Sequence, residues 1–275
     1  MSRKPSIRTA ARPTTEAAPA VAPRKTRRNS INLLDLAYER LEHLIVVCEL
    51  RPGALLTIQD LQDMTGFSRT PVHQAVTRLA ADTLISIRPR HGLQVAPVDL
   101  ARERLLLKLR RDLERFVVRL AAERANSSHR NQILHLSRQL RERRDAITIA
   151  EFNAYDRRID QLVLAAAGEP FLEHTLRPLH TLFRRIGWIY HNRASGYSDI
   201  TETIDTHLAV LDAVIARDAE QAVQSSDTLI DFVDRMFAVI EREVDPTFLD
   251  CSLEPILPVV SGEPKAQGTA VLPRT

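Results

Sequence analysis

Apolar residues recur at helical spacing along most of this 275-residue chain, and the pattern changes character near residue 100. From there to about residue 243 the period is helical throughout. It predicts six helices, at about 100–125, 130–146, 149–167, 169–192, 198–217 and 219–243. Short connections between these helices are typical of an antiparallel bundle, so we expect one all-helical domain over residues 98–244.

Residues 31–97 contain shorter elements in a different order. An apolar stripe over residues 34–48 predicts a first helix, which ends at the turn Arg51-Pro52-Gly53. The run Thr57-Ile58-Gln59-Asp60 has the form of a capping box and starts a second helix, which Thr65-Gly66 ends.

A third short helix carries the most informative surface of the chain. Pro71 fits its first helical position and Thr70 fits its cap, while Val72, Val76 and Leu79 predict one buried stripe. The other side chains face away from that stripe and are suited to DNA bases and phosphates; they are Arg69, Thr70, His73, Gln74, Thr77 and Arg78.

Two alternating segments, 85–87 and 93–95, follow and predict a two-stranded wing. Together with the preceding helices they predict a winged helix-turn-helix, which is a DNA-binding fold. Between residues 68 and 92 the only acid is Asp82, so positive charge is concentrated where phosphates would lie. The wing adds the candidate DNA contacts Arg88, Arg90, His91 and Gly92.

The two ends of the chain have compositions that do not support a core. Residues 1–30 hold eight basic side chains against Glu16, which predicts a disordered basic arm that either adds non-specific DNA affinity or is inert. Residues 245–275 are rich in proline and predict a flexible tail. No segment has the apolar length of a secretory signal or a membrane span, so we expect a cytoplasmic protein without membrane contact. The net charge of +3 by itself excludes little.

Two cysteines, Cys48 and Cys251, lie far apart in the sequence and lack the spacing of metal ligands. Neither a disulfide framework nor a zinc finger is predicted. Cys48 continues the apolar stripe of the first helix, and we expect it to be a small buried side chain.

Three runs in the N-terminal part keep the spacing of a known DNA-binding domain. They are Leu50-Arg51-Pro52-Gly53, Gly66-Phe67-Ser68-Arg69-Thr70-Pro71-Val72 and Arg88-Pro89-Arg90-His91-Gly92. Together they resemble GntR-family bacterial transcription regulators. The resemblance implies a homodimer that binds a pseudo-palindromic double-stranded DNA operator, usually as a repressor. The family usually has Arg then Glu where this chain has His73 and Gln74, which implies a different operator half-site.

The helical part carries three motifs that are weak individually and fairly specific when taken together. They are Arg110 with Glu114, the run Asp156-Arg157-Arg158-Ile159-Asp160 before Ala167-Gly168-Glu169-Pro170, and His207 to Val214 before Asp218. These motifs resemble the FCD ligand-sensing domain of the FadR-type branch of the GntR family. The resemblance implies an organic acid as the effector.

Ionisable side chains also fall on the apolar stripes of the bundle. Asp156 and Asp160 lie one turn apart at the border of one stripe, His207 lies within another, and Arg110 is flanked by Leu106, Leu109, Leu113 and Val117. Because an unpaired buried charge costs several kcal/mol, these groups should converge on one another or on a ligand. We expect an effector-binding pocket of Arg110, Asp156, Asp160 and His207, in which Arg110 binds a carboxylate or pairs with Glu114 or Asp156.

The fourth helix has four further polar side chains that could line this pocket. They are His180, Arg184, Arg185 and His191. Because they are long and polar and lie on a helix, we expect them to be solvated.

The resemblance also implies a divalent metal ion in the pocket, bound by one aspartate and three histidines. This chain keeps Asp156 and His207 but has Asp160 and Leu229 at the other two positions, so the set is incomplete. Asp156, Asp160 and His207 would favour Mg²⁺ or Mn²⁺ over tightly bound Zn²⁺. A buried cluster without metal is the alternative.

These patterns predict a mainly α protein that combines a winged helix-turn-helix with an FCD-like helical bundle. The predicted function is a sequence-specific transcription regulator, not an enzyme, whose operator binding responds to a small metabolite. One alternative is a DNA-binding protein that senses no ligand. The other is a metal-dependent hydrolase at Asp156, Asp160 and His207, for which the sequence offers no nucleophile, phosphate loop or cofactor motif.

Overall fold

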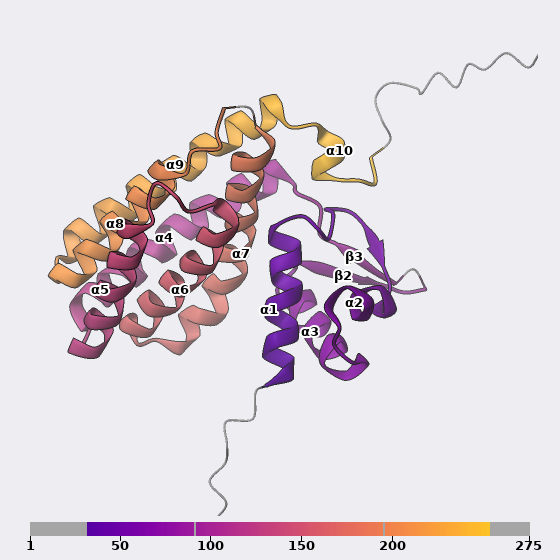
Figure 1. Ribbon diagram of the computed structural model, residues 1–275, viewed down its shortest axis with the longest axis horizontal. Helices are drawn as coiled ribbons and strands as arrows, with labels where there is room; N and C mark the ends of the chain where they lie inside the picture. Colours follow the sequence, from indigo (N-terminus) through magenta and orange to yellow (C-terminus); the bar gives the residue numbers. More distant parts are fainter. Residues whose placement is uncertain (1–31, 91, 195, 254–275) are drawn as a thin grey trace, which may run out of the picture. The chain divides into compact units, whose positions relative to one another are not determined.

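Helices account for most of the computed structural model, which describes residues 32–90, 92–194 and 196–253 (Figure 1). The elements in chain order are α1 (Leu33–Val46), β1 (Leu55–Leu56), α2 (Ile58–Thr65), α3 (Arg69–Ala81), β2 (Ile85–Arg88), β3 (Gly92–Val95), α4 (Leu100–Arg124), α5 (Ser127–Glu142), α6 (Ile149–Ala167), α7 (Pro170–Arg193), α8 (Thr201–Ala216), α9 (Ala219–Glu243) and α10 (Pro246–Leu249). The predicted fold class, mainly α with a small wing, is confirmed.

Helices α1 to α3 and the small sheet, called the N-terminal lobe below, pack around a core of their own. Leu41, Leu61 and Leu79 are completely buried in it. Helix α2 begins at the predicted capping box, in which the side chains of Thr57 and Asp60 each accept a hydrogen bond from the other residue's backbone N–H. The helices of this lobe therefore follow the predicted order.

Helix α3 begins two residues earlier than the sequence predicts. Ser68, rather than Thr70, is its N-cap, and Pro71 is its third helical residue. Proline is tolerated there because the N–H groups of the first turn have no partner inside the helix. The Ser68 side chain makes no capping hydrogen bond, so it does not satisfy those N–H groups.

The wing has three strands where the sequence predicts two. Leu55 and Leu56 form β1, which pairs antiparallel with β3, and the strand order is β1-β3-β2. Gly92 at the start of β3 has a φ of 85°, and a Cβ there would lie 2.7 Å from the carbonyl oxygen of Leu56. Glycine therefore permits the close approach of β1 and β3.

Helices α4 to α9 form the predicted bundle. Helix α5 spans Ser127–Glu142 rather than 130–146, because Asn126 caps it by accepting a hydrogen bond from the N–H of His129. Helix α6 begins at a capping box of Thr148 and Glu151 and has the predicted bounds. No described helix combines the length and the apolarity needed to cross a bilayer.

The segment after α9 is partly helical, which corrects the prediction of an irregular tail from residue 245. The carbonyl of Leu249 in α10 accepts a hydrogen bond from the N–H of Val98 at 2.8 Å. The N–H of Cys251 donates to the carbonyl of Pro52 at 2.9 Å. The described part of this segment is thereby tied to the chain on both sides of the wing. The predicted basic arm of residues 1–30 and the rest of the tail lie outside the described residues.

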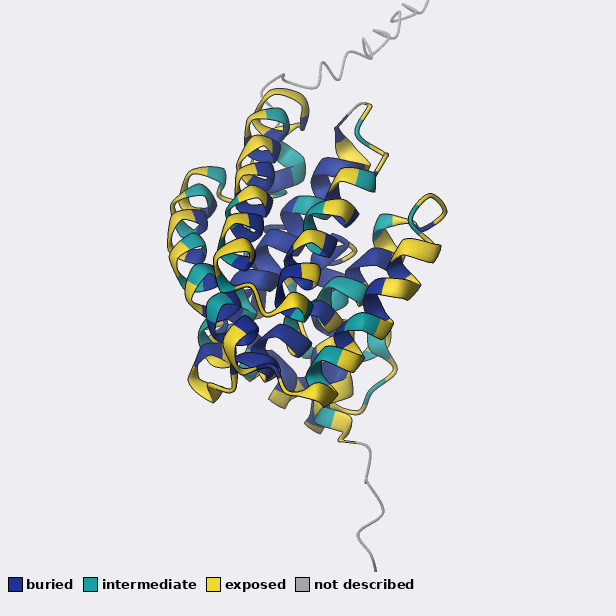
Figure 2. Cartoon of the chain, turned by 90° about the vertical axis from the view of Figure 1, so that its left-hand side faces the viewer, coloured by how far each residue is buried: buried dark blue, intermediate teal, exposed yellow. Residues whose placement is uncertain are grey.

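Apolar side chains form two cores, and Figure 2 shows the buried residues on the facing sides of the helices. Leu182 of α7 belongs to the core of the N-terminal lobe. Cys48 is buried, as predicted, but it lies in the turn after α1 and packs into the core of the bundle. The described residues from Leu33 onward thus pack as one compact unit.

Helix α7 corrects one expectation from the sequence. His180, Arg184, Arg185 and His191 are not solvated but are only 1–7% exposed. Arg185 shows the cause, since it donates to the carbonyl of Ala96 at 2.8 Å and to the carboxylate of Glu103 at 2.9 Å. Protein oxygens replace water around the guanidinium, which makes its burial tolerable.

Replacement of Arg185 by leucine is expected to lower the free energy of unfolding by about 3–5 kcal/mol, because Glu103 would stay buried without its partner. Chemical denaturation of the wild type and the variant measures this difference. Arg138→Leu, at an exposed position of α5, is the control and should change stability by no more than about 0.5 kcal/mol. Equal stability of the two variants would contradict the role of the buried pair.

Candidate functional site

The outward face of α3 is the first candidate site. Arg69, Thr70, His73, Gln74 and Thr77 are all exposed, because the apolar stripe on the opposite side of the helix is buried. The hydroxyl of Thr77 donates to the carbonyl of His73 at 2.9 Å. The predicted orientation of these five side chains agrees with the structure, and their contacts with DNA stay a prediction.

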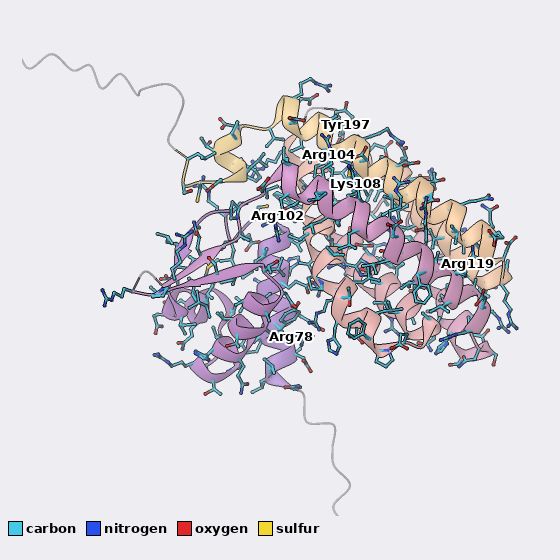
Figure 3. All side chains as sticks on the ribbon, turned by 180° about the vertical axis from the view of Figure 1, so that it is seen from behind. Arg78, Arg102, Arg104, Lys108, Arg119 and Tyr197 are labelled. Carbon is cyan, nitrogen blue, oxygen red and sulfur yellow. The ribbon has the colours of Figure 1, made fainter. Side chains whose placement is uncertain are left out.

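Arg78 lies differently from its neighbours on α3. Its guanidinium stacks on the ring of Tyr38 in α1 at 4.1 Å and lies 3.3 Å from the carboxylate of Asp35. Figure 3 marks Arg78 in the N-terminal lobe. The sequence predicts that Arg78 faces outward, but its side chain lies against α1 and is only 31% exposed.

Asp82, the acid that follows α3, is turned inward. It accepts a hydrogen bond from the hydroxyl of Tyr38 at 2.8 Å and lies 3.3 Å from the guanidinium of Arg177 in α7. Burial raises the pKa of Tyr38, and the nearby Glu42 and Asp82 carboxylates add to this effect. The negative charge of Asp82 is therefore removed from the surface that carries the outward residues of α3.

The wing carries the other candidate DNA contacts. Arg88, Arg90 and Gly92 are exposed at the end of the β2–β3 hairpin, as the sequence predicts. His91 lies outside the described residues.

The second candidate site is a group of ionisable side chains, called the charged cluster below. Its members come from α1, α4, α6, α7 and α8 and are Glu42, Arg110, Glu114, Asp156, Arg157, Asp160, His180, Arg184 and His207. Arg184 lies at its centre. Its Nε donates to Asp156 at 2.9 Å, its Nη2 donates to Asp160 at 2.7 Å, and its Nη1 donates to Glu42 at 3.4 Å.

Both histidines of the cluster have oxygen atoms on either side of the ring. For His207, Nδ1 lies 2.6 Å from the carbonyl of Thr203 and Nε2 lies 3.1 Å from Asp156. For His180, Nε2 lies 2.7 Å from Glu114 and Nδ1 lies 3.3 Å from Asp160. A ring flanked by two acceptors needs both protons, so this geometry favours the charged form. Burial lowers the pKa of each histidine, but the neighbouring acids outweigh it and the net pKa is raised.

Arg110 pairs with Glu114, which is one of the alternatives that the sequence leaves open. Its Nε donates to the carboxylate at 3.1 Å, and its guanidinium lies 5.1 Å from the centre of the Phe183 ring. Burial raises the pKa of Glu114, but His180 and Arg110 outweigh this effect and bring the pKa to about 2. Leu109, which the sequence places beside Arg110 on the inward face, is 50% exposed.

The two aspartates of α6 respond differently to the same cluster. Burial acts to raise the pKa of Asp156, but His207 and Arg184 hold that pKa well below its usual range. Burial also raises the pKa of Asp160, and the charge of Asp156 adds to it, so the net pKa stays raised despite His180 and Arg184. Asp156 is therefore the more firmly ionised of the pair.

The charged cluster separates an open hollow from the interior of the bundle. The hollow has a volume of about 580 Å³ and is lined mainly by α1, α6 and α7, with Asp160, His180 and Arg184 on its wall. On the other side of these residues lie two cavities of only about 30 and 40 Å³. Cavities of this size hold one or two water molecules, so a metabolite can enter the bundle only if side chains move.

The predicted metal ligands converge, but the residues present do not fit a metal ion. The carboxylate of Asp156 contacts the ring of His207, and the guanidinium of Arg184 contacts both Asp156 and Asp160. The carboxylates of both aspartates are engaged by Arg184, and Nε2 of His207, the ring nitrogen that could bind a cation, is turned to Asp156. Among the described residues, no three His, Cys, Asp or Glu side chains are arranged to hold a metal.

Three further residues complete the cluster: Glu42, which the sequence interpretation missed, and His180 and Arg184, which it named as possible pocket residues but expected to be solvated. A signal for two of them exists, since His180 and Arg184 are one turn apart beside the buried positions Leu176 and Phe183 of α7. Glu42 follows Leu41 on α1, and nothing in the local sequence indicates that its partner lies in a helix far along the chain.

Comparison with known proteins identifies both parts of the chain. Residues 34–95 match the model of the bacterial regulatory proteins of the gntR family, and residues 105–232 match the FCD domain. The HTH-type transcriptional repressor RspR of Escherichia coli K12 is 27% identical over 186 residues, which cover 66% of this chain and 79% of RspR. The HTH-type regulator BphR of Paraburkholderia xenovorans is 26% identical over 210 residues, which cover 71% of this chain and 81% of BphR.

Solved structures show the same fold. E. coli McbR/YncC has a TM-score of 0.65 at 21% identity, over 76% of this chain and 98% of that protein. A putative GntR regulator from Rhodococcus sp. RHA1 has a TM-score of 0.57 at 17% identity, over 74% of this chain and 97% of that protein. These likenesses show the fold, and the two family models together span more than half of the chain. The chain belongs to the GntR family of bacterial regulatory proteins, as a DNA-binding transcription regulator rather than an enzyme, with an FCD effector-binding domain.

Proposed function

We propose that this regulator is a homodimer that represses transcription from a pseudo-palindromic operator in the cytoplasm, where its DNA target lies, and that a small organic acid at the charged cluster changes its operator affinity. The observation that carries the proposal is the outward face of α3, where Arg69, His73, Gln74 and Thr77 are exposed on a helix whose other side is buried. A rigid helix with such side chains suits readout of the major groove.

The side chains on this face contact different parts of the DNA. Thr70, His73, Gln74 and Thr77 contact base edges, because their hydroxyl, imidazole and amide groups can donate to and accept from bases. The exposed guanidinium groups and the N–H groups of the first turn of α3, which Ser68 leaves uncapped, contact phosphates. The guanidinium groups are those of Arg69, Arg88 and Arg90, with the Gly92 amide and His91 as further contacts.

Arg78 contacts DNA differently from the other arginines. Because it is stacked on Tyr38 and paired with Asp35, it reaches a phosphate only from the side of α1.

Selection of bound sequences from a random DNA pool by the purified full chain tests the proposal. We expect an inverted repeat whose half-sites are about one helical turn apart. A single half-site would contradict the dimer, and the absence of any enriched sequence would contradict specific readout. Repression is tested by a reporter placed behind the selected repeat, whose output should fall when the protein is expressed.

The dimer contact is assigned to an exposed face of α4. Leu105, Leu109 and Phe116 share this face and are 65%, 50% and 52% exposed. If two α4 helices pair antiparallel about a twofold axis, Leu105 lies against Phe116 of the second copy, and Lys108 lies near Asp112 of that copy. Lys108 is marked on α4 in Figure 3. The face is therefore complementary to itself in both apolar contact and charge.

The effector is assigned to the boundary between the hollow and the charged cluster. Three arginines and two histidines there offer charge-assisted hydrogen bonds to a carboxylate, and apolar residues such as Val117, Val163 and Leu229 line the cavity behind them. A small acid with a short apolar part combines both features. Because the carboxylates already have partners, we propose that the site works without Mg²⁺, Mn²⁺ or Zn²⁺.

A regulator that senses no ligand is the second candidate function. It is favoured by the small size of the internal cavities and by the pairing of each acid in the charged cluster with a cation. Operator affinity that stays constant across a panel of mono- and dicarboxylic acids would support it.

His73→Ala and Gln74→Ala are each expected to relax the preference for one base of the half-site, at a cost of about 1–3 kcal/mol. Arg90→Ala should instead weaken binding to all sequences alike and reduce the slope of log affinity against log salt by about 1. Fluorescence anisotropy with the selected repeat and its single-base variants, at several salt concentrations, separates these effects. Arg138→Ala on the bundle is the control, and unchanged base preference in both α3 variants would show that they do not read bases.

Phe116→Glu is expected to shift the protein from dimer to monomer, because the twofold axis brings two buried carboxylates into an apolar contact. Sedimentation velocity over a range of protein concentrations measures the shift. Phe171→Glu is a matched control, since Phe171 is 73% exposed on α7. The assignment is wrong if Phe116→Glu and Phe171→Glu sediment alike.

The ionised state of the charged cluster predicts a pH dependence. The pKa of Glu114 is about 2 in the folded protein and about 4.3 when unfolded. A lowered pKa stabilises the fold above the unfolded value, and this contribution is lost as the pH falls toward 2. Glu114→Gln should therefore cost about 3 kcal/mol at pH 7 and about half of that at pH 3.

Denaturation curves at both pH values test this expectation. Glu142→Gln, at an exposed position of α5, serves as the control. A cost that is the same at pH 7 and pH 3 would show that the cause is packing rather than charge.

A further inference from the structure

We infer that Arg184 is the built-in cation of the effector pocket, which neutralises Asp156 and Asp160 in place of a metal ion, and that its third contact, with Glu42, links the pocket to helix α1 of the N-terminal lobe. The link to operator binding rests on the proposed function. The neutralisation of the two aspartates does not.

The first step is the charge balance on α6. Asp156 and Asp160 lie one helical turn apart, and their side chains are only 14% and 16% exposed. Two carboxylates this close repel each other unless a cation lies between them. The guanidinium of Arg184, with a side chain 4% exposed, donates to an oxygen of each at 2.9 and 2.7 Å. Arg184 therefore supplies the positive charge that the two carboxylates share, whereas His207 and His180 each contact only one of them.

The second step is the contact across to α1. Glu42 is 4% exposed, and its carboxylate lies 3.4 Å from Arg184 and 3.0 Å from Arg157. It also accepts a hydrogen bond from the hydroxyl of Thr181. Helix α1 packs against α3, which carries the outward residues of the first site. One arginine thus contacts acids of both the bundle and the N-terminal lobe.

The third step is the position of this contact on the wall of the hollow. Glu42, Asp160 and Arg184 all line it. An anion that reaches the wall can compete with Glu42 for Arg184, because the contact of Glu42 is the longest of the three and Glu42 keeps Arg157 as a partner. The exchange leaves Asp156 and Asp160 neutralised. The exchange releases Glu42 from Arg184, and α1 would transmit this change to α3, against which it packs.

The metal arm of the test uses the full chain after EDTA treatment and dialysis, with MnCl₂ or ZnCl₂ as the probe. In the wild type, neither salt should raise the melting temperature, and isothermal titration should show no stoichiometric site. In Arg184→Ala, the two aspartates lose the cation that they share and keep only one histidine each, so the melting temperature should fall and Mn²⁺ should partly restore it. Arg184→Lys keeps one positive charge and should respond to metal less than Arg184→Ala.

A wild-type protein that binds one equivalent of either metal, with a melting-temperature shift as large as that of Arg184→Ala, would overturn the assignment of Arg184 as the pocket cation. If Arg184→Ala does not fold, the comparison of Arg184→Lys with the wild type tests whether Arg184 is the pocket cation. A metal-induced stabilisation is then expected only in the lysine variant, because its ammonium group cannot reach all three acids as the fork of Arg184 does.

The α1 arm compares Glu42→Gln with Glu39→Gln, since Glu39 is an exposed acid of the same helix. Amide hydrogen exchange in α1 should become several-fold faster in Glu42→Gln and stay unchanged in Glu39→Gln. Affinity for the selected inverted repeat should change several-fold in the first variant only. Unchanged exchange and affinity in Glu42→Gln would refute the link.

The two hypotheses fail in different ways. A wild type that selects no DNA sequence refutes the proposed function, while metal binding and hydrogen exchange are read without DNA and still decide on Arg184.

Discussion

The compensation of the buried and partly buried arginines on α7 is the constraint on which the rest of the structure depends. Arg177 contacts Asp82, Arg184 contacts Glu42, and Arg185 contacts the carbonyl of Ala96 and the carboxylate of Glu103. A guanidinium withdrawn from water is costly unless its donors find oxygen atoms. Arg184 and Arg185 also pair with acids of the bundle helices α6 and α4, but the contacts with Glu42 and Asp82 form only when the N-terminal lobe packs against the bundle.

The same ion pairs shape the surface that faces DNA. Asp82 follows directly after α3, where a free carboxylate would repel phosphates. Its contacts with Tyr38 and Arg177 draw that charge inward. Packing between lobe and bundle therefore serves two purposes, since it satisfies an arginine of α7 and removes an acid from beside α3. The outward face of α3 is left with Arg69 and with polar side chains that include no acid.

The predictable parts of the structure are those whose causes are local. Helix α6 could be bounded from the sequence because Thr148 and Gly168 mark its two ends. The start of α3 is harder to place, because Ser68 and Thr70 are both common N-cap residue types. Strand β1 has two residues and no alternation, so no local pattern reveals it. The burial of Arg184 was missed for another reason. Periodicity shows which face a side chain occupies, but its partner Glu42 lies in a helix of the other lobe.

An arginine and a metal ion neutralise paired carboxylates in different ways, and the difference bears on how a ligand can act. A bound metal has coordination positions that a ligand oxygen can fill. A guanidinium keeps its charge and has donors in a fixed plane, so a new acid must displace one already bound. If Arg184 released Asp156 or Asp160, that buried carboxylate would keep only a histidine as its partner, whereas Glu42 keeps the guanidinium of Arg157 and has the longest contact of the three. Displacement of Glu42 from Arg184 is therefore the least costly way for an anion to bind. Because Glu42 belongs to α1, binding of an anion to Arg184 changes a contact of the lobe that binds DNA.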